Sequence, residues 1–327
     1  MNNKALALEI LQNKTGLVFE GGGILGICHG GALIRLYELG GLKHIEYLVG
    51  TSVGSIISTG LALGASSYYI KSKLFSMDTS RVEDGGNIFS KICRFFFKFG
   101  VNKGDYIETF IEEIINDLTG NKNITFQEAY DLTGIHLTIP YLSVKEKRTK
   151  YADYINTPIL HIKTAVRWSS TMPFVFKPNR IYNKGKLSDL ILDGGILDNY
   201  PLHVLKDQEC NSRNIIGFKL CDKTEMDQYK QYSDDNNGDE GNENLSTNLV
   251  DFTVDLFEIL YQKLMGSHVH KDEWKLTCKI DIGKYKSTDF NLTDEDKMWL
   301  YNSGRDAVDK HLEEIEEMLN NNDYPNN

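Results

Sequence analysis

A serine held between two glycines is the first residue of this sequence that is suited to chemistry. It lies in Gly50-Thr51-Ser52-Val53-Gly54, directly after the apolar residues 45–49. A Gly-x-Ser-x-Gly pentapeptide between a strand and a helix is typical of a nucleophile elbow, a sharp turn that exposes the serine hydroxyl. Gly50 and Gly54 would remove side chains that clash in so tight a turn. The alternative interpretation is a glycine-rich packing turn without chemistry.

A glycine loop, Gly21-Gly22-Gly23-Ile24-Leu25-Gly26, follows the apolar residues 17–19. Its spacing satisfies the dinucleotide-binding fingerprint, but that site needs an acidic residue at the end of the second strand. The second expected strand ends in Tyr47-Leu48-Val49, without an acid. Backbone N–H groups in the loop are better suited to stabilising the oxyanion of an acyl-transfer intermediate. The candidate oxyanion-hole residues are Gly21, Gly22, Gly23, Ile24 and Gly26.

A base must remove the proton of the Ser52 hydroxyl, and none of the eight histidines is well placed for this role. His29 precedes the serine inside an expected helix, and His203 falls at the start of another. Asp193-Gly194-Gly195 is the better candidate, because the aspartate ends an apolar strand and glycines allow close approach. A carboxylate serves as this base when partial desolvation raises its pKa. A simple Asp-Gly turn is the alternative.

These motifs together resemble the patatin-like phospholipase family. The match consists of the glycine loop, the serine pentapeptide, and Asp193-Gly194-Gly195 followed by Asn199-Tyr200-Pro201. Residues 165–173 also resemble the family's helix that ends in proline before the aspartate strand. The resemblance runs from about residue 17 to 201, and weakly over 289–304.

The resemblance implies a three-layer α/β fold and a lipid acyl hydrolase with a Ser–Asp dyad. Ser52 would be the nucleophile, Asp193 the base and the glycine loop the oxyanion hole. The substrate would be a fatty-acyl ester of a phospholipid or a neutral glycerolipid, cleaved through an acyl-enzyme with no cofactor and no metal. Many members carry Lys or Arg where this sequence has Leu25. That departure bears on the substrate class and not on the activity.

Apolar periodicity along the chain predicts alternating strands and helices, and therefore an α/β fold with a largely parallel central sheet flanked by helices. Strands are expected at residues 16–19, 45–49, 136–144, 150–154, 190–192, 214–220 and 277–282. Helices are expected at residues 5–12, 27–39, 53–63, 106–118, 125–132, 163–172 and 249–265, with one or two more over 293–319. Crossover connections make the first two strands neighbours, so the serine turn and the glycine loop should meet.

The domain organisation follows from the same pattern. Residues 1–14 should form a helical extension and 15–320 a single hydrolase domain, followed by a disordered tail over 321–327. Inside that domain, residues 233–248 are polar and acidic and should form a disordered loop.

Composition excludes some classes of function. The net charge of −10 argues against general nucleic-acid binding. Five scattered cysteines without CxxC spacing, and no signal-peptide pattern, predict a cytoplasmic protein. No apolar run is long enough to span a membrane. The resemblance implies a lipid substrate as the partner, and therefore transient association with a membrane or droplet surface; an activating protein is a further possibility.

The aromatic stretch over residues 88–99 has two interpretations. Its phenylalanines alternate with lysines and an arginine, a composition suited to an anionic membrane surface. The same composition fits a buried helix whose basic side chains reach out to water. We favour the buried helix. For the whole chain, the alternative to an enzyme is a non-catalytic lipid-binding or scaffolding protein that keeps the fold.

Overall fold

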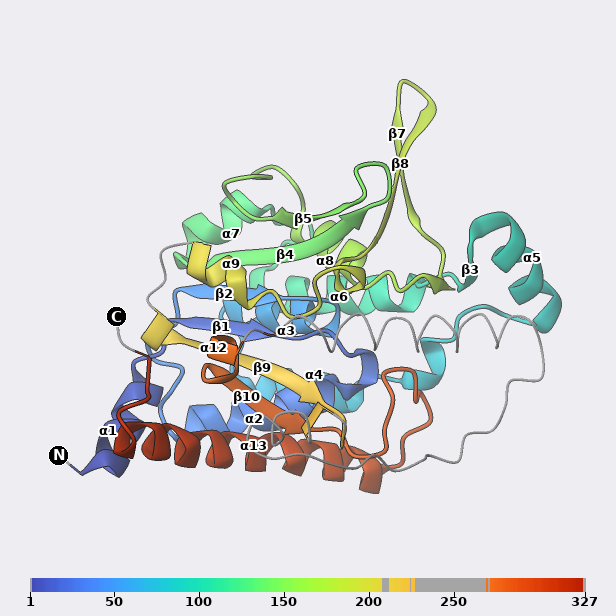
Figure 1. The fold of residues 1–327 in the computed structure, drawn as a ribbon. Coiled ribbons are helices and arrows are strands. Elements are labelled where there is room, and N and C mark those ends of the chain that lie inside the picture. The colour runs from blue at the N-terminus through green and yellow to red at the C-terminus, as the bar shows by residue number, and fades with distance from the viewer. Residues whose placement is uncertain (1, 208–211, 224, 227–268, 270, 326–327) are drawn as a thin grey trace.

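A computed structural model describes residues 2–207, 212–223, 225–226, 269 and 271–325. Its centre is an eight-stranded sheet with the order β10-β9-β1-β2-β4-β8-β7, and β5 pairs with β4 beside this path (Figure 1). The strands are β1 (Gly16–Phe19), β2 (Tyr47–Gly50), β4 (His136–Ser143), β5 (Arg148–Ala152), β7 (Asn179–Asn183), β8 (Lys186–Asp193), β9 (Ile215–Cys221) and β10 (Thr277–Asp281). Pairing from β10 through β4 is parallel, whereas β4, β8, β7 and β5 pair antiparallel.

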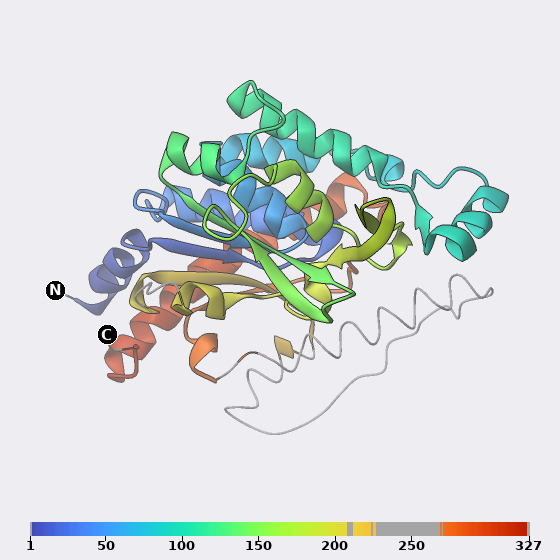
Figure 2. The same ribbon diagram turned by 90° about the horizontal axis from the view of Figure 1, so that it is seen from above.

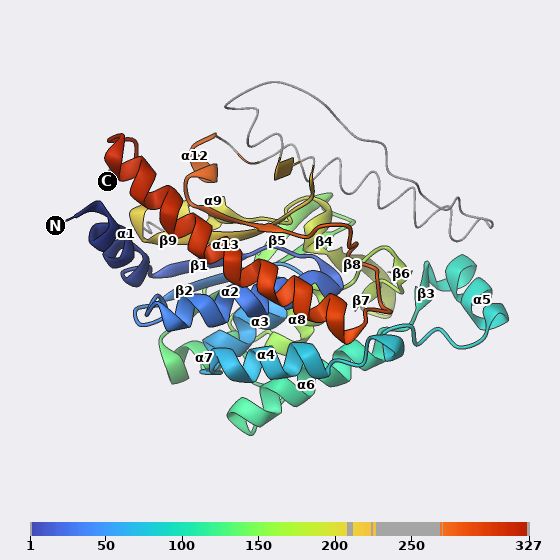
Figure 3. The same ribbon diagram turned by 90° about the horizontal axis from the view of Figure 1, so that it is seen from below.

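Helices cover both faces of the sheet, which confirms the predicted three-layer α/β architecture (Figures 2 and 3). One face carries α2 (Gly26–Glu38), α3 (Val53–Ala62) and α8 (Ile162–Ser169), with α4 (Ser67–Ser76), α6 (Asp105–Thr119) and α13 (Asp294–Asn320) packed outside or beside them. The other carries α9 (Leu202–Asp207) and α12 (Lys271–Trp274).

Side-chain alternation along the strands explains the two layers. In β1, Leu17 and Phe19 belong to the large core under α2 and α3, whereas Val18 packs with Leu202 and Leu205 of α9. Successive side chains of a strand point to opposite faces, so a strand that is apolar at every position is buried on both sides. The first two strands are parallel neighbours, as the sequence predicts, and Phe19 lies opposite Gly50.

Local interactions between residues close in the sequence define several of these elements. The strands β4 and β5 pair antiparallel around the charged turn that joins them. Thr125 caps α7 (Phe126–Thr133) in a capping box with Glu128. Thr293 does the same for α13 with Asp296, and this closing helix is continuous.

Other features were not predicted. The strand that ends at Asp193 begins at Lys186, four residues before the predicted start, and forms a hairpin with β7. A separate two-stranded sheet joins β3 (Gly100–Asn102) to β6 (Phe174–Phe176). The predicted loop 233–248 and helix 249–265 lie outside the described residues.

The prediction of a buried helix over residues 88–99 is wrong. The helix forms as α5 (Ile88–Lys98), but Phe89, Phe96 and Phe97 are exposed. Figures 1–3 place α5 at one end of the molecule, beyond the sheet and away from both termini. Burial requires a neighbouring element as well as apolar side chains, and the sequence shows only the side chains.

The two ends of the described chain pack together. α1 (Asn3–Gln12) lies against α13, and its Ala7 joins a buried cluster with Ile315 and Tyr324. Lys14 donates to the hydroxyl of Tyr324, which lies in the stretch predicted as a disordered tail. The domain boundaries at residues 15 and 320 stay a prediction. No helix in the described ranges is long and apolar enough to cross a bilayer.

Candidate active site

Ser52 occupies a strained turn between β2 and α3. Its backbone has φ 52° and ψ −122°, a conformation that residues with a side chain rarely adopt. A Cβ at Gly50 would overlap the Gly54 carbonyl, and one at Gly54 would overlap the carbonyl of Phe19 at the end of β1. The pentapeptide therefore needs both glycines, because the elbow is pressed against the neighbouring strand. This is the geometry of a nucleophile elbow.

The glycine loop lies beside the elbow. A Cβ at Gly21 would meet the Cβ of Ser52 and the side chain of Asn199, so only glycine fits there. Gly23 has φ +54°, and its own Cβ would overlap the Ser287 carbonyl. The loop then continues as a 3-10 turn, η1 (Gly23–Leu25), into α2.

The hydrogen bonds of the loop divide the predicted oxyanion-hole residues into two groups. The Ile24 N–H donates to the Ser287 carbonyl at 3.1 Å, and the Gly21 N–H donates to the Asn199 carbonyl at 3.3 Å. The Gly26 N–H donates within η1. Among the described residues, no acceptor contacts the N–H of Gly22 or Gly23. These two groups are available to a ligand, whereas the other three already have acceptors.

Asp193 ends β8 and is buried, with 2% of its surface exposed. One carboxylate oxygen accepts the Gly195 N–H at 2.8 Å, and the carboxylate interacts with the Ser52 side chain. Burial raises the pKa of Asp193 to about 7, although the Gly195 N–H and the Ser52 side chain both lower it. A Cβ at Gly194 would overlap the Pro140 carbonyl, so the turn that presents the carboxylate packs directly on β4. The structure thus brings Ser52 and Asp193 together.

The end of α8 and the two residues after it hold the backbones of Ser52 and Asp193. The sequence analysis did not assign this segment to the site. Ser169 Oγ accepts the backbone N–H of Ser52 at 3.0 Å. The Thr171 carbonyl accepts the backbone N–H of Asp193 at 2.9 Å. The signal was the stretch 165–173, which carried part of the family resemblance but suggested no role for individual residues.

Asn199 links the aspartate segment to the glycine loop. Its Nδ2 donates to the Gly21 carbonyl at 3.0 Å, and its own carbonyl accepts the Gly21 N–H. The hydroxyl of Thr51 donates to the Asp198 carbonyl at 3.3 Å. Three segments distant in the sequence are therefore hydrogen-bonded around Ser52.

A buried ion pair supports the start of the glycine loop. Lys219 Nζ lies 2.9 Å from Glu20 Oε1 and 3.1 Å from a carboxylate oxygen of Glu225. Burial raises the pKa of Glu20 to about 7, against the opposing effect of Lys219. The second Glu20 oxygen accepts the Leu220 N–H at 2.6 Å, which joins the ends of β1 and β9. Nothing in the sequence analysis indicates this ion pair.

The two histidines considered as bases have other neighbours. His29 is buried in α2, where its Nε2 lies 2.9 Å from the Glu20 carbonyl and burial lowers its pKa to about 4. His203 lies on α9 beside Tyr151 and Asp198. Asp193, by contrast, interacts directly with the Ser52 side chain.

A family model, curated proteins and a solved structure resemble this chain. The model of the patatin-like phospholipase family matches residues 17–206. An uncharacterized protein of Acanthamoeba polyphaga mimivirus is 28% identical over 90% of this chain and 93% of its own length. A probable lipid hydrolase of invertebrate iridescent virus 6 is 26% identical over 70% of this chain and 76% of its own. VipD from Legionella pneumophila superposes with a TM-score of 0.59 at 18% identity, covering 92% of this chain and 67% of that one.

Proposed function

Since the chain belongs to the patatin-like phospholipase family, we propose that it is a lipid acyl hydrolase that acts through a Ser52–Asp193 dyad. The observation that carries the proposal is a buried carboxylate, with its pKa raised to about 7, beside a serine on a strained elbow. A carboxylate with that pKa is a far better proton acceptor at neutral pH than an exposed aspartate.

Acylation begins when Ser52 Oγ attacks the carbonyl carbon of the ester. The hydroxyl proton passes to the Asp193 carboxylate, and the carbonyl oxygen becomes an oxyanion. The N–H groups of Gly22 and Gly23 are the loop's donors for this oxyanion, because they have no other acceptor among the described residues. The ester C–O bond then breaks, and the leaving alcohol takes the proton from Asp193.

Deacylation repeats the same steps with water. A water molecule gives its proton to Asp193 as its oxygen attacks the acyl carbon, and the bond to Ser52 Oγ breaks. The proton returns from Asp193 to the serine, and the fatty acid leaves. The strained backbone at Ser52 keeps the hydroxyl exposed through both steps.

One residue of the glycine loop, Leu25, bears on the substrate class. Leu25 is buried in the core beneath the loop, so no cation stands at this position of the loop for a phosphate group. We propose fatty-acyl esters of phospholipids or neutral glycerolipids, met at a membrane or droplet surface. The name of the iridescent-virus relative, a probable lipid hydrolase, supports the lipid class.

The test uses a fluorophosphonate probe and lipid mass spectrometry. The wild-type chain should be labelled at Ser52 and should release fatty acids from mixed vesicles, whereas Ser52→Ala should do neither. A folded wild-type chain that takes no label and changes no lipid would refute the proposal. That outcome would favour the second candidate, a non-catalytic lipid-binding protein that keeps the fold.

A further inference from the structure

The helix α5 has an apolar face that is turned to solvent. Phe89, Cys93, Phe96 and Phe97 share one side of the helix at i, i+4, i+7 and i+8. Phe89, Phe96 and Phe97 are 72%, 57% and 74% exposed. Exposed apolar patches of this kind mark surfaces for a partner or a membrane.

The opposite side of α5 is firmly attached to the molecule. Arg94 Nη1 donates to the carbonyls of Gly85 and Val101 at 2.9 and 2.7 Å. The ring of Phe95 packs against Phe174 of β6, with centroids 6.2 Å apart. These contacts fix the rotation of the helix about its axis. The apolar face therefore points outward because of built contacts, and not because the helix is loosely attached.

Basic residues are frequent around this face. Residues 88–104 and 172–188 each contain four basic residues and no acidic residue, although the chain carries a net charge of −10. Two of these lysines have acidic partners outside the segments, Lys91 with Glu83 and Lys177 with Asp105. The two segments are joined through the β3–β6 sheet, and Arg180 lies over the ring of Phe99 at 5.8 Å. Lys98, Lys184 and Lys186 are exposed. Aromatic residues among lysines and arginines are the composition of a helix that binds an anionic lipid surface.

The β7–β8 hairpin adds to the same surface. It follows β6 directly, and it carries the exposed side chains of Tyr182 and Leu187 beside its lysines. In Figure 1 the hairpin projects upward from the half of the molecule in which α5 lies, and α5 extends to the right. The arrowheads of β4 and β9 point toward this end, so it is the side on which the carboxyl ends of the parallel strands lie.

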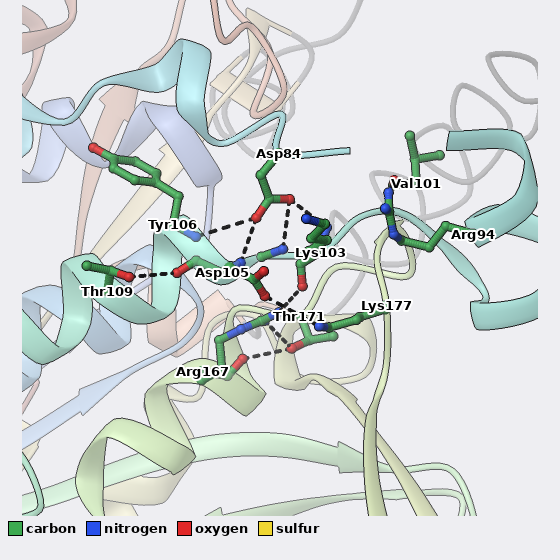
Figure 4. Close-up of polar contacts among 11 residues, drawn as sticks. Asp84, Arg94, Val101, Lys103, Asp105, Tyr106, Thr109, Arg167, Thr171 and Lys177 are labelled. Carbon is green, nitrogen blue, oxygen red and sulfur yellow. Dashed lines mark hydrogen bonds and ion pairs between the residues drawn. The ribbon is translucent and has the colours of Figure 1, made fainter. Parts of the chain in front are cut away.

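Hydrogen bonds connect α5 and its sheet to the catalytic centre. Asp84 accepts the N–H groups of residues 103–106, and Arg167 Nη2 donates to the Lys103 carbonyl at 3.1 Å (Figure 4). The other terminal nitrogen of Arg167 donates to Thr171 Oγ1 at 2.7 Å. Thr171 is the residue whose carbonyl holds Asp193. A surface that binds through α5 is thus rigidly placed relative to the dyad.

We propose that α5 and the β7–β8 hairpin are the surface with which this protein docks on an anionic phospholipid bilayer. Phe89, Phe96 and Phe97 insert among the lipids, and the surrounding lysines pair with anionic headgroups. This inference rests on the proposed lipid acyl hydrolase and adds the element that contacts the bilayer and the charge of the lipid.

The test measures sedimentation of the full chain with vesicles, in the Ser52→Ala background so that binding is separated from hydrolysis. The Ser52→Ala chain should bind vesicles of mixed phosphatidylcholine and phosphatidylserine, and bind them more tightly than pure phosphatidylcholine. Adding Phe96→Ser with Phe97→Ser should weaken binding by roughly tenfold or more, because two aromatic side chains no longer leave water. The matched control is Leu132→Ser with Ile159→Ser, two exposed apolar residues elsewhere, which should leave binding unchanged.

A second pair of variants tests the charge without touching the apolar face. Lys98→Gln with Lys186→Gln should lower the affinity for phosphatidylserine vesicles by about fivefold per lysine and remove part of its salt dependence. These exposed changes keep the test valid if the phenylalanine variant fails to fold, as judged by its thermal melt. No binding to either vesicle, equal binding to both, or full binding by the phenylalanine or lysine variants would each overturn the proposal.

The failure of this inference and of the proposed function are distinguishable. Binding is measured with a chain that cannot hydrolyse, and labelling of Ser52 is measured without vesicles. A labelled enzyme that does not bind anionic vesicles refutes the docking surface alone. If the wild type instead binds another protein in solution and the α5 variant does not, the surface binds a protein partner and not a bilayer. A chain that binds through α5 but takes no label refutes the hydrolase alone.

Discussion

The backbone N–H of Ser52 donates to the side-chain oxygen of Ser169 at 3.0 Å, so the last residue of α8 holds the elbow. Two residues further on, Thr171 holds the backbone of Asp193. One short segment therefore fixes the separation of the two proposed catalytic residues.

Replacing Ser169 should lower activity through position alone. Ser169→Ala removes the acceptor for the Ser52 N–H, and we expect kcat/KM for a short-chain nitrophenyl ester to fall about tenfold, the equivalent of one hydrogen bond. The matched control is Ser58→Ala on α3, because the Ser58 hydroxyl is buried and has no partner among the described residues. Equal activities of the two variants would contradict the positioning role.

Activity should depend on the protonation of Asp193. Its pKa of about 7 means that the carboxylate, which accepts the serine proton, is lost as the pH falls below about 7. We expect kcat/KM of the wild type to fall about tenfold per pH unit below that value. Asp193→Asn should lack activity, and Asp189→Asn on the same strand should keep the wild-type profile. A wild-type profile that is flat from about pH 5 to 8 would rule out this base.

The Asp193 carboxyl should also make stability depend on pH: activity rises as this group ionises, whereas its contribution to the stability of the fold falls. Its pKa is raised from 3.8 to about 7 by burial, so the folded chain binds more protons than the unfolded chain between these values. The contribution is fully present below about pH 4 and is lost as the pH rises through about 7. Asp193→Asn should therefore be more stable than wild type near pH 8, by on the order of 4 kcal/mol, and similar to it near pH 4.

Denaturant titrations of the wild type and of Asp193→Asn, near the same two pH values, measure this difference in the free energy of unfolding. Glu20 also has a pKa raised to about 7, mainly by burial, but it is present in both chains and cancels in the comparison. A difference in the free energy of unfolding that does not change with pH would contradict the assignment.

The strain at Ser52 should be visible as a gain in stability when it is relieved. Glycine adopts a positive φ without cost, so Ser52→Gly should be more stable than Ser52→Ala by about 1 kcal/mol. At the exposed position Glu113 in the middle of α6, the order should be reversed, because alanine favours a helix by about 1 kcal/mol over glycine. Chemical denaturation of the glycine and alanine variants at both positions measures their free energies of unfolding. If alanine were the more stabilising residue at both positions, the elbow would be unstrained.

Much of the site could be predicted because it is built from local turns. The elbow and the glycine loop are short segments whose glycines are dictated by backbone contacts, and such contacts leave a direct mark on the sequence. Asp193 was recognised in the same way, from the two glycines that follow it. The central parallel strands were also predicted, since strands buried on both faces are apolar throughout.

The predictions failed where one segment must meet another. Ser169, Asn199 and Glu20 act through hydrogen bonds to distant segments. Asn199 and the stretch around Ser169 belong to the family resemblance, but the neighbouring residues do not indicate what any of the three side chains binds. The exposure of α5 was missed for the same reason, because the sequence shows which face is apolar but not what lies opposite it.

The sequence by itself determined the elbow, the glycine loop, the aspartate turn and the α/β order, because backbone geometry at each depends on adjacent residues. Only the tertiary structure decided that Asp193 is buried against Ser52, with its pKa raised by desolvation. It also decided that Gly22 and Gly23, and not Ile24, keep N–H groups available. Burial and hydrogen-bond partners are set by segments far apart in the chain, so they exist only after the strands have packed.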